Sequence, residues 1–280
     1  MRDRFGTIRP PPLFNKRGNT MPPANTAYTA SDMDFINPDT MELYCNTNAH
    51  LLSSPPRAFL LELPGLGGGS CLGGSMDIAP YNGPLSSVLA ENGILQAYVF
   101  PGPWSWMNRG AVRMIHALVD AIRGKYGFTV STPWGVMGGS MGGLGALILT
   151  ASHGGDPARI PTVCLAHCPC VDVPDRLNCH PHIPRTFFRA VADYEMPIAE
   201  ALKTISPLHR LEDMPHIPYH VINDLADELF PAEQTDGYVE KLVAKGHEVT
   251  YHRLAGCGHG ALTTEEWDFI RDFLLIHLAR

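Results

Sequence analysis

A serine among glycines is the residue of this chain best suited to nucleophilic chemistry. Residues 138–142 read Gly-Gly-Ser-Met-Gly, which matches the pattern G-x-S-x-G and centres on Ser140. An apolar run precedes this segment and an apolar helical run follows it, so we expect a tight turn between a buried strand and a helix. Such a turn lifts the hydroxyl clear of the sheet, and its glycines let strand and helix approach closely. The alternative is a glycine-rich loop whose serine caps a helix.

An alcohol needs a base to take its proton, and the base needs a carboxylate to orient it. Candidates for both groups follow predicted strands. Asp227 lies in the segment 223–231, and His259 lies in the glycine-rich segment 255–260 after the last predicted strand. Because ligand sites of parallel sheets form at the carboxyl ends of the strands, we expect both side chains beside Ser140.

Each of these assignments has an alternative. His259 could be a loop histidine that bonds to the backbone. Three other acids compete with Asp227 for the role of the orienting carboxylate, namely Asp172, Asp224 and Glu228. Asp224 could instead stabilise its own loop by accepting hydrogen bonds from nearby backbone groups.

The elements that must position these residues alternate between strands and helices from residue 94 onward. Expected strands are 94–100, the run before Ser140, 160–167, 217–222 and 246–254; expected helices are 84–92, 108–126, the run after Ser140, 231–245 and 264–278. This alternation predicts an α/β fold with a mostly parallel sheet covered by helices on both faces. Three further strands are expected within 28–63, including 41–45 and 57–63.

One large domain is expected, preceded by a proline-rich leader at residues 1–27. Residues 28–280 form the domain, and residues 172–205 form an insertion placed where a lid would lie over the site. Its apolar side chains are expected to face the pocket, the alternative being ordinary packing on the sheet: Phe187, Phe188, Tyr194 and Met196.

Composition excludes several classes of function. The chain has 280 residues, of which 45% are hydrophobic and 18% charged, and its net charge is −7. This acidic balance does not favour binding to nucleic acid or to an anionic membrane surface. The amino-terminal residues carry charge and proline instead of an apolar run, and the seven cysteines are an odd number, so we expect a cytoplasmic protein with reduced thiols.

These motifs together resemble the α/β-hydrolase superfamily, in particular the catalytic domain of the prolyl oligopeptidase family and related small serine esterases. The resemblance covers about residues 57–280 and is carried by 138–143, by 206–208 with 227–231, and by 258–260. It implies an α/β-hydrolase fold in which Ser140 is the nucleophile, His259 the general base and then acid, and Asp227 the orienting carboxylate. Two departures are an Asn-Asp pair at 223–224, where the family usually has His-Gly, and the lack of a propeller domain.

The resemblance also implies an oxyanion hole, which needs two N–H donors. The backbone N–H of Met141 is one expected donor, and the loop at 65–69 supplies the other from Leu66 or Gly67. Trp104 and Trp106 follow another core strand at the same edge. They are interpreted either as an apolar wall of the substrate pocket or as packing within a surface loop.

The cysteine-rich segment after residue 167 invites a zinc interpretation, with Cys168, Cys170, Cys179, His180 and His182 as candidate ligands. These spacings fit no structural zinc pattern well, so core thiols and surface histidines are favoured and no metal is expected. Cys257, close to His259 in sequence, is interpreted as a small buried residue, the alternative being a modifiable thiol near the site.

The sequence therefore predicts a serine esterase that cleaves small or medium acyl esters through an acyl-enzyme and needs no cofactor. The alternatives are a peptidase or amidase with the same triad, for which only Glu195 and Glu200 suggest recognition of a free amino group, an acyltransferase, and a non-catalytic binding protein. The expected partner is a small ester or short peptide, neither nucleic acid nor membrane is expected, and a homodimer is left open.

Overall fold

A seven-stranded sheet forms the centre of the molecule. The computed structural model describes residues 35–66, 80–178 and 181–279, so the leader expected at 1–27 lies outside the described residues. The strand order is β1-β3-β2-β4-β5-β6-β7. The strands are β1 Cys45–Thr47, β2 Ala58–Leu63, β3 Ile94–Val99, β4 Trp134–Gly139, β5 Val163–His167, β6 Tyr219–Asp224 and β7 Val249–Leu254. β1 runs antiparallel to β3, and the other described pairings are parallel, as predicted.

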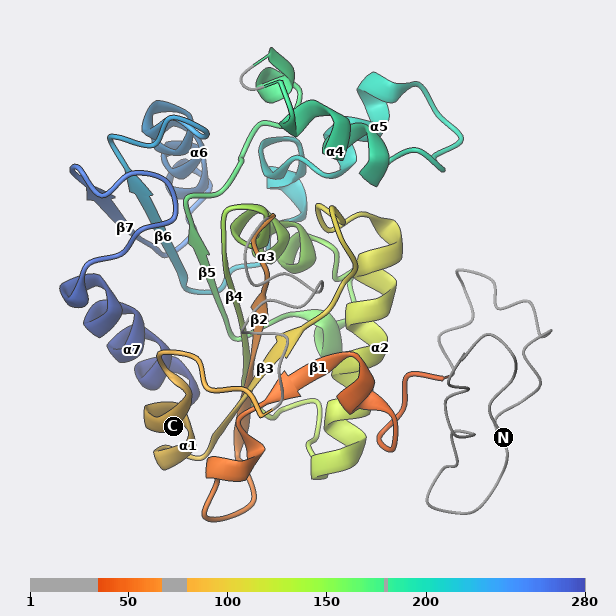
Figure 1. Ribbon diagram of the computed structural model, residues 1–280, viewed down its shortest axis with the longest axis vertical. Helices are drawn as coiled ribbons and strands as arrows, with labels where there is room; N and C mark the ends of the chain where they lie inside the picture. Colours follow the sequence, from red (N-terminus) through yellow and green to blue (C-terminus); the bar gives the residue numbers. More distant parts are fainter. Residues whose placement is uncertain (1–34, 67–79, 179–180, 280) are drawn as a thin grey trace, which may run out of the picture.

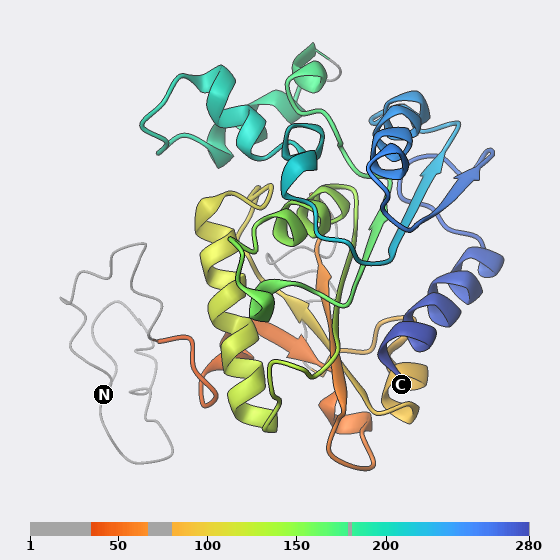
Figure 2. The ribbon, with the colours of Figure 1, turned by 180° about the vertical axis from the view of Figure 1, so that it is seen from behind.

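Helices cover both faces of the sheet (Figures 1 and 2). The helices are α1 Ser86–Glu91, α2 Arg109–Tyr126, α3 Met141–Ala151, α4 Ile183–Ala190, α5 Ile198–Thr204, α6 Ala232–Ala244 and α7 Thr264–Leu278. α2, α3 and α6 pack on one face, α1 and α7 pack on the other, and α4 and α5 lie beyond the carboxyl ends of the strands (Figure 1). In the described part of the chain, no helix has both the length and the apolar character needed to span a membrane.

Alternation along β2 shows how the sheet divides the core. Phe59 and Leu61 point into the cluster under α2 and α3, whereas Ala58 and Leu60 point into the cluster under α1 and α7. All four side chains are fully buried. A strand that is buried on both faces reads as a continuous apolar run, which is why residues 57–63 predict a central strand of a parallel sheet.

Helix α2 matches its prediction because both of its ends carry strong local signals. The Asn108 side chain accepts a hydrogen bond from the Ala111 N–H, and Gly127 ends the helix in the left-handed conformation with φ of 70°. The strand expected at 41–45 was wrong. Met41–Leu43 forms a 3-10 turn instead, because the Asn37 carbonyl accepts the N–H groups of Thr40 and Met41, and β1 begins only at Cys45.

Candidate active site

Ser140 lies in a strained turn between β4 and α3. Its φ of 57° and ψ of −120° are rare for a residue with a side chain, and its N–H donates to the His167 carbonyl at 2.9 Å. Strained backbone of this kind persists only where the surroundings hold it in place. The turn places the serine at the carboxyl edge of the sheet and at the amino end of α3, as the G-x-S-x-G pattern predicts.

Close backbone contacts explain the glycines around this serine. A Cβ atom on Gly138 would lie 2.5 Å from the carbonyl carbon of Gly142, and one on Gly142 would lie 2.2 Å from the Leu63 carbonyl oxygen. A Cβ atom on Gly143 would lie 2.6 Å from the His167 carbonyl oxygen. The turn can therefore form only when these positions have no side chain.

A continuous chain of hydrogen bonds links Ser140, His259 and Asp227. The Ser140 Oγ lies 2.8 Å from His259 Nε2, and His259 Nδ1 lies 2.8 Å from Asp227 Oδ2. Because a carboxylate only accepts hydrogen bonds, His259 donates through Nδ1; in the neutral imidazole, Nε2 can then accept a hydrogen bond from the Ser140 hydroxyl. The Asp227 side chain is fully buried, whereas the His259 side chain is 21% exposed.

Backbone groups hold the Asp227 carboxylate in this orientation. The N–H groups of Leu229 and Phe230 both donate to Asp227 Oδ1 at 2.9 Å. This leaves Oδ2 to accept the bond from His259. The Phe230 ring also meets the His259 ring edge-on, with 5.2 Å between the ring centroids, and so limits the movement of the imidazole.

Asp224 joins the two loops that carry Asp227 and His259. Its Oδ1 accepts the Ala226 N–H at 2.7 Å, and its Oδ2 accepts the Cys257 N–H at 2.8 Å. Burial raises the pKa of Asp224, but these backbone N–H groups outweigh burial and lower the pKa below its usual value. None of the three competing acids makes the hydrogen bond that Asp227 makes to His259. Asp224 holds the two loops together, Glu228 is exposed, and Asp172 Oδ1 lies 3.7 Å from His209 Nε2.

Asn223 occupies the position at which the sequence departs from the prolyl oligopeptidase pattern. Its buried side chain donates to the Phe230 carbonyl at 3.1 Å and to Thr235 Oγ1 at 2.9 Å. The amide therefore closes the loop that carries Asp227 onto the first turn of α6. A side chain with two N–H donors is needed there.

Cys168, which the sequence analysis interprets as a core thiol, lies next to the site. It is fully buried, follows β5 with φ of 39°, and lies with Asp227 and His259 in a group whose polar atoms are within 4.8 Å of one another. Burial raises the pKa of Cys168, but hydrogen bonds with His167 and His259 outweigh burial and lower the pKa to about 6. Its position directly after a predicted strand is the sequence signal that pointed to this edge of the sheet, but only the strand order brings it to His259.

The charge around His259 favours its protonated form. Burial lowers the pKa of His259, but the hydrogen bonds and negative charge of Asp227 and Cys168 outweigh burial and raise the pKa to about 10. The same groups would stabilise an imidazolium at His259.

A cavity of about 340 Å³ opens onto Ser140 and His259. Its walls are mainly apolar and come from the loop after β2, the segment before α2, the start of α4 and the loop before α6: Leu66, Trp106, Ile183, Leu229 and Phe230. No carboxylate lines this cavity among the residues that the structure describes. The cavity therefore suits an uncharged, apolar group.

The two tryptophans of the sequence prediction occupy different surroundings. Trp106 is fully buried, lines the cavity and donates from Nε1 to Thr186 Oγ1 at 2.9 Å. Trp104 is 39% exposed, and the Arg185 guanidinium lies 5.9 Å from the centre of its ring. Of the two, only Trp106 is among the described residues that line this cavity.

The insertion at 172–205 contributes Ile183 to the cavity wall. Phe187 supports the wall from behind, with its ring 4.4 Å from that of Trp106, whereas Phe188 is 43% exposed. α4 is amphipathic, so Ile183 and Phe187 share its buried face. Tyr194 and Met196, also expected at the pocket, lie instead in a separate hollow beside α2.

The described part of the predicted oxyanion hole lies close to Ser140. Met141 is the first residue of α3, where backbone N–H groups have no partner within the helix. Leu66 lines the cavity, and a Cβ atom on its neighbour Gly65 would lie 3.9 Å from the Ser140 Cβ. Gly67 lies outside the described residues. The second donor therefore stays a prediction.

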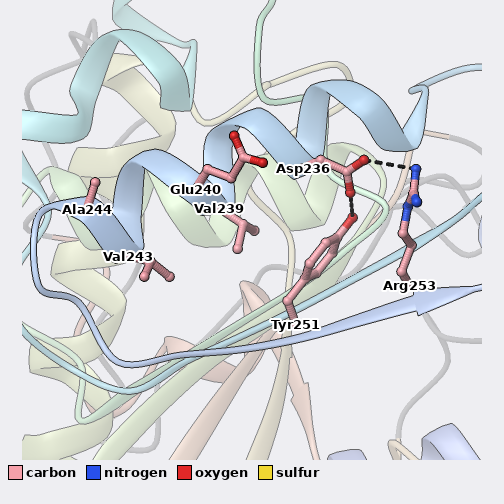
Figure 3. Close-up of a pocket in the computed structure, with 7 residues that line it drawn as sticks. All are labelled: Asp236, Val239, Glu240, Val243, Ala244, Tyr251 and Arg253. Carbon is pink, nitrogen blue, oxygen red and sulfur yellow. Dashed lines mark hydrogen bonds and ion pairs between the residues drawn. The ribbon is translucent and has the colours of Figure 1, made fainter.

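A larger hollow of about 570 Å³ lies away from this site, between α6 and β7 (Figure 3). Its charged groups bind one another: Asp236 accepts from the Tyr251 hydroxyl at 2.8 Å and pairs with Arg253 at 2.9 Å. The figure also shows Val239 and Val243 along the helix. Among the described residues that line this hollow there is no serine, cysteine or histidine.

The candidate zinc ligands after β5 are only partly described, because Cys179 and His180 lie outside the described residues. Cys168 and Cys170 are fully buried, as expected of core thiols. Cys257 is only partly buried, contrary to the interpretation as a small buried residue, because its loop lies at the surface and contacts Asp224 through the backbone.

No family model matches the chain, and no curated protein matches it in sequence. Solved structures do resemble it. The acylaminoacyl peptidase of Pyrococcus horikoshii has a TM-score of 0.64 at 16% identity, over 82% of this chain and 39% of the peptidase. A truncated carbohydrate esterase from gut microbiota has a TM-score of 0.64 at 15% identity, over 81% of this chain and 88% of the esterase. Esterase B from Lactobacillus Rhamnosis has a TM-score of 0.59 at 12% identity, over 81% of this chain and 78% of the esterase.

These likenesses establish the fold. With its mostly parallel sheet and its strand–serine–helix turn, the chain has the α/β-hydrolase fold, as its motifs predict. The chain spans about two fifths of the length of the acylaminoacyl peptidase.

Proposed function

We propose that this chain is a serine hydrolase that cleaves uncharged carboxylic esters through an acyl-enzyme. The observation that carries the proposal is the chain of hydrogen bonds from Ser140 through His259 to Asp227, with both contacts at 2.8 Å. Distances of this size allow proton transfer from the hydroxyl to the imidazole as the oxygen attacks.

In the first half of the reaction, the Ser140 Oγ bonds to the ester carbonyl carbon and its proton passes to His259 Nε2. The carbonyl oxygen becomes an oxyanion, which the Met141 N–H and a donor from the loop after β2 would stabilise. Loss of one such donor typically costs about 3 kcal/mol of barrier. His259 then gives its proton to the departing alcohol as the carbon–oxygen bond breaks.

Water completes the reaction by entering the place that the alcohol has left, beside His259. His259 takes a proton from the water as its oxygen bonds to the acyl carbon, and the proton returns to Ser140 when the acid leaves. Asp227 keeps its negative charge throughout and stabilises the imidazolium in both halves.

The cavity supports an ester substrate over a peptide with a free amino terminus. A charged amine would need a carboxylate, and none of the described residues lining this cavity has one. Glu195 and Glu200 are exposed, and Glu200 pairs with Lys203 at 2.8 Å. Among the similar structures, the two esterases match over most of their length, whereas the acylaminoacyl peptidase matches over 39%.

The same triad also supports a second candidate, a peptidase or amidase, because several of the similar structures are peptidases. An acyltransferase would differ only in the acceptor that attacks the acyl-enzyme. Product analysis with added alcohols distinguishes transfer from hydrolysis.

The test is labelling by a fluorophosphonate together with turnover of two substrate panels. We expect the chain to be labelled and to hydrolyse p-nitrophenyl esters much faster than aminoacyl-anilides. Ser140→Ala should lose both labelling and turnover while keeping its thermal stability. Labelling that survives in Ser140→Ala would contradict the assigned nucleophile, and faster anilide cleavage would favour the peptidase.

A further inference from the structure

A cluster of residue types that bind metal ions lies between β6, β7 and α7, apart from the catalytic residues. His220, His252 and Glu266 each offer one ligand atom, and these atoms all lie within 4.8 Å of one another. β6 and β7 pair in parallel with Ile222 opposite His252, and side chains two residues apart share a face of a strand. His220 and His252 therefore both point toward α7, which supplies Glu266.

His220 is the strongest sign that the cluster holds a ligand. Its side chain is only 1% exposed, and neither ring nitrogen has a hydrogen-bond partner among the residues that the structure describes. The ring packs edge-on against His252 and Phe273, with centroid distances of 4.7 Å and 4.9 Å. A buried polar group without a partner costs about 1–3 kcal/mol, so native proteins rarely keep one without a reason.

The two other residues of the cluster, His252 and Glu266, are already in contact with each other. His252 Nδ1 lies 2.9 Å from Glu266 Oε2, and the Glu266 side chain is only 9% exposed. Glu266 follows the helix cap Thr263, whose Oγ1 accepts the Glu266 N–H at 3.2 Å. In an ordinary capping box the glutamate carboxylate would bind the backbone at the cap. Here it meets the histidine instead, within the cluster.

We propose that His220, His252 and Glu266 bind one divalent transition-metal ion of the zinc class. Two imidazole nitrogens and one carboxylate oxygen are a ligand set that zinc accepts in proteins, with a water molecule as fourth ligand. Magnesium and calcium prefer oxygen ligands, so the two histidines disfavour them. The His252 side chain is 22% exposed and provides the route from solvent.

The position of the cluster indicates a stabilising role for the ion. His252 lies on the strand that leads into the loop of His259, and Glu266 lies in the first turn of the helix that follows this loop. His220 lies on β6, whose carboxyl end leads to Asp227. An ion bound there would hold together the elements from which the Asp227 and His259 loops start. This role does not depend on ester hydrolysis at Ser140.

The direct test is zinc binding to untagged full-length protein that has been treated with a chelator and desalted. Calorimetric titration with ZnCl₂ should give one ion per chain, and CoCl₂ should give the visible absorption of a low-symmetry site. At zinc one hundred times above its Kd, the Tm should rise by about 5 °C. Absence of zinc uptake by the wild-type protein would overturn the proposal.

Two variants test the ligands separately. His220→Phe removes a ligand but fills the space, so the rise in Tm with zinc should disappear while the metal-free Tm is kept or increased. Glu266→Gln keeps a side chain of nearly the same shape and should weaken zinc binding at least tenfold if His220→Phe does not fold.

Two control variants should keep the zinc response. His247→Phe changes another buried histidine, which stacks on His216 outside the cluster. Cys168→Ala tests whether zinc binds instead at the group formed by Cys168, Asp227 and His259. Both ring nitrogens of His259 already have hydrogen-bond partners there, Ser140 and Asp227, so the zinc response should be unchanged. Equal binding by the wild-type protein, His220→Phe and Glu266→Gln would contradict the assignment of the site.

Discussion

The Asp224 carboxylate accepts the backbone N–H of Cys257 at 2.8 Å and thereby joins the loop of Asp227 to the loop of His259. A second oxygen of Asp224 accepts the Ala226 N–H. The distance between Asp227 and His259 therefore depends on a carboxylate that has no hydrogen bond to either of these two side chains. This dependence can be tested.

We expect Asp224→Ala to reduce both activity and stability. The substitution removes the hydrogen bonds that partly buried backbone N–H groups make to a carboxylate, which costs about 1–3 kcal/mol of unfolding free energy. It also loosens the alignment of His259, for which a loss of about a hundredfold in kcat/KM is expected. Thermal unfolding and ester kinetics measure the two effects. In the matched variant Asp224→Asn, which keeps one acceptor oxygen, both losses should be smaller; unchanged kinetics in Asp224→Ala would show that the loops are held by other contacts.

Cys168 is expected to set the pH at which the site becomes active. His259 must be neutral to accept the Ser140 proton, so activity rises with pH through the pKa of His259. Cys168 is one of the groups that raise this pKa, so Cys168→Ala should move the acid limb of the kcat/KM profile to lower pH. Ester hydrolysis across a pH series measures the shift.

Cys164→Ala is the matched control for this prediction. Cys164 is a buried cysteine on β5, and burial raises its pKa to about 12, so the thiol is uncharged across the assay range. Its removal should leave the acid limb in place. Equal profiles for the wild-type protein and Cys168→Ala would mean that the thiol does not act on His259.

The turn at Ser140 should be intolerant of even one added methyl group. In Gly142→Ala the new Cβ would lie 2.2 Å from the Leu63 carbonyl oxygen, so strand and helix must separate. We expect a cost of about 1–3 kcal/mol and loss of most activity. Gly237→Ala is the control, because its Cβ meets only the end of the Lys241 side chain at 4.0 Å. Placed in α6, it should stabilise the protein by about 0.5–1 kcal/mol. If Gly142→Ala keeps full activity, the close approach is not needed.

Local sequence signals predicted most of the fold because they lie within the elements that they define. Asn108 and Gly127 mark both ends of α2, and the alternation of strands and helices indicates the parallel sheet. The structure also brings together Ser140, Asp227 and His259, each of which follows a strand.

Other features could not be predicted because they depend on contacts between distant segments. The alternation at 41–45 resembles a strand, yet hydrogen bonds to Asn37 bend it into a turn. Cys168 approaches His259 only because β5 lies between β4 and β6 in the sheet. The pairing of His252 with Glu266 requires α7 to fold back against β7, which no pattern within either segment indicates.

The cavity wall offers a test of substrate size. Ile183 lines the cavity from the start of α4, whereas Phe188 on the same helix is 43% exposed. Ile183→Ala should enlarge the cavity and shift the preferred p-nitrophenyl ester toward longer acyl chains, because each buried methylene contributes about 0.8 kcal/mol to binding. The cost in stability should be about 2–5 kcal/mol, since the residue is buried. Phe188→Ala removes a larger side chain from the same helix and should leave the chain-length preference unchanged. If both variants shift the preferred acyl chain length equally, the change does not come from the cavity wall at Ile183. The acyl group would then bind elsewhere.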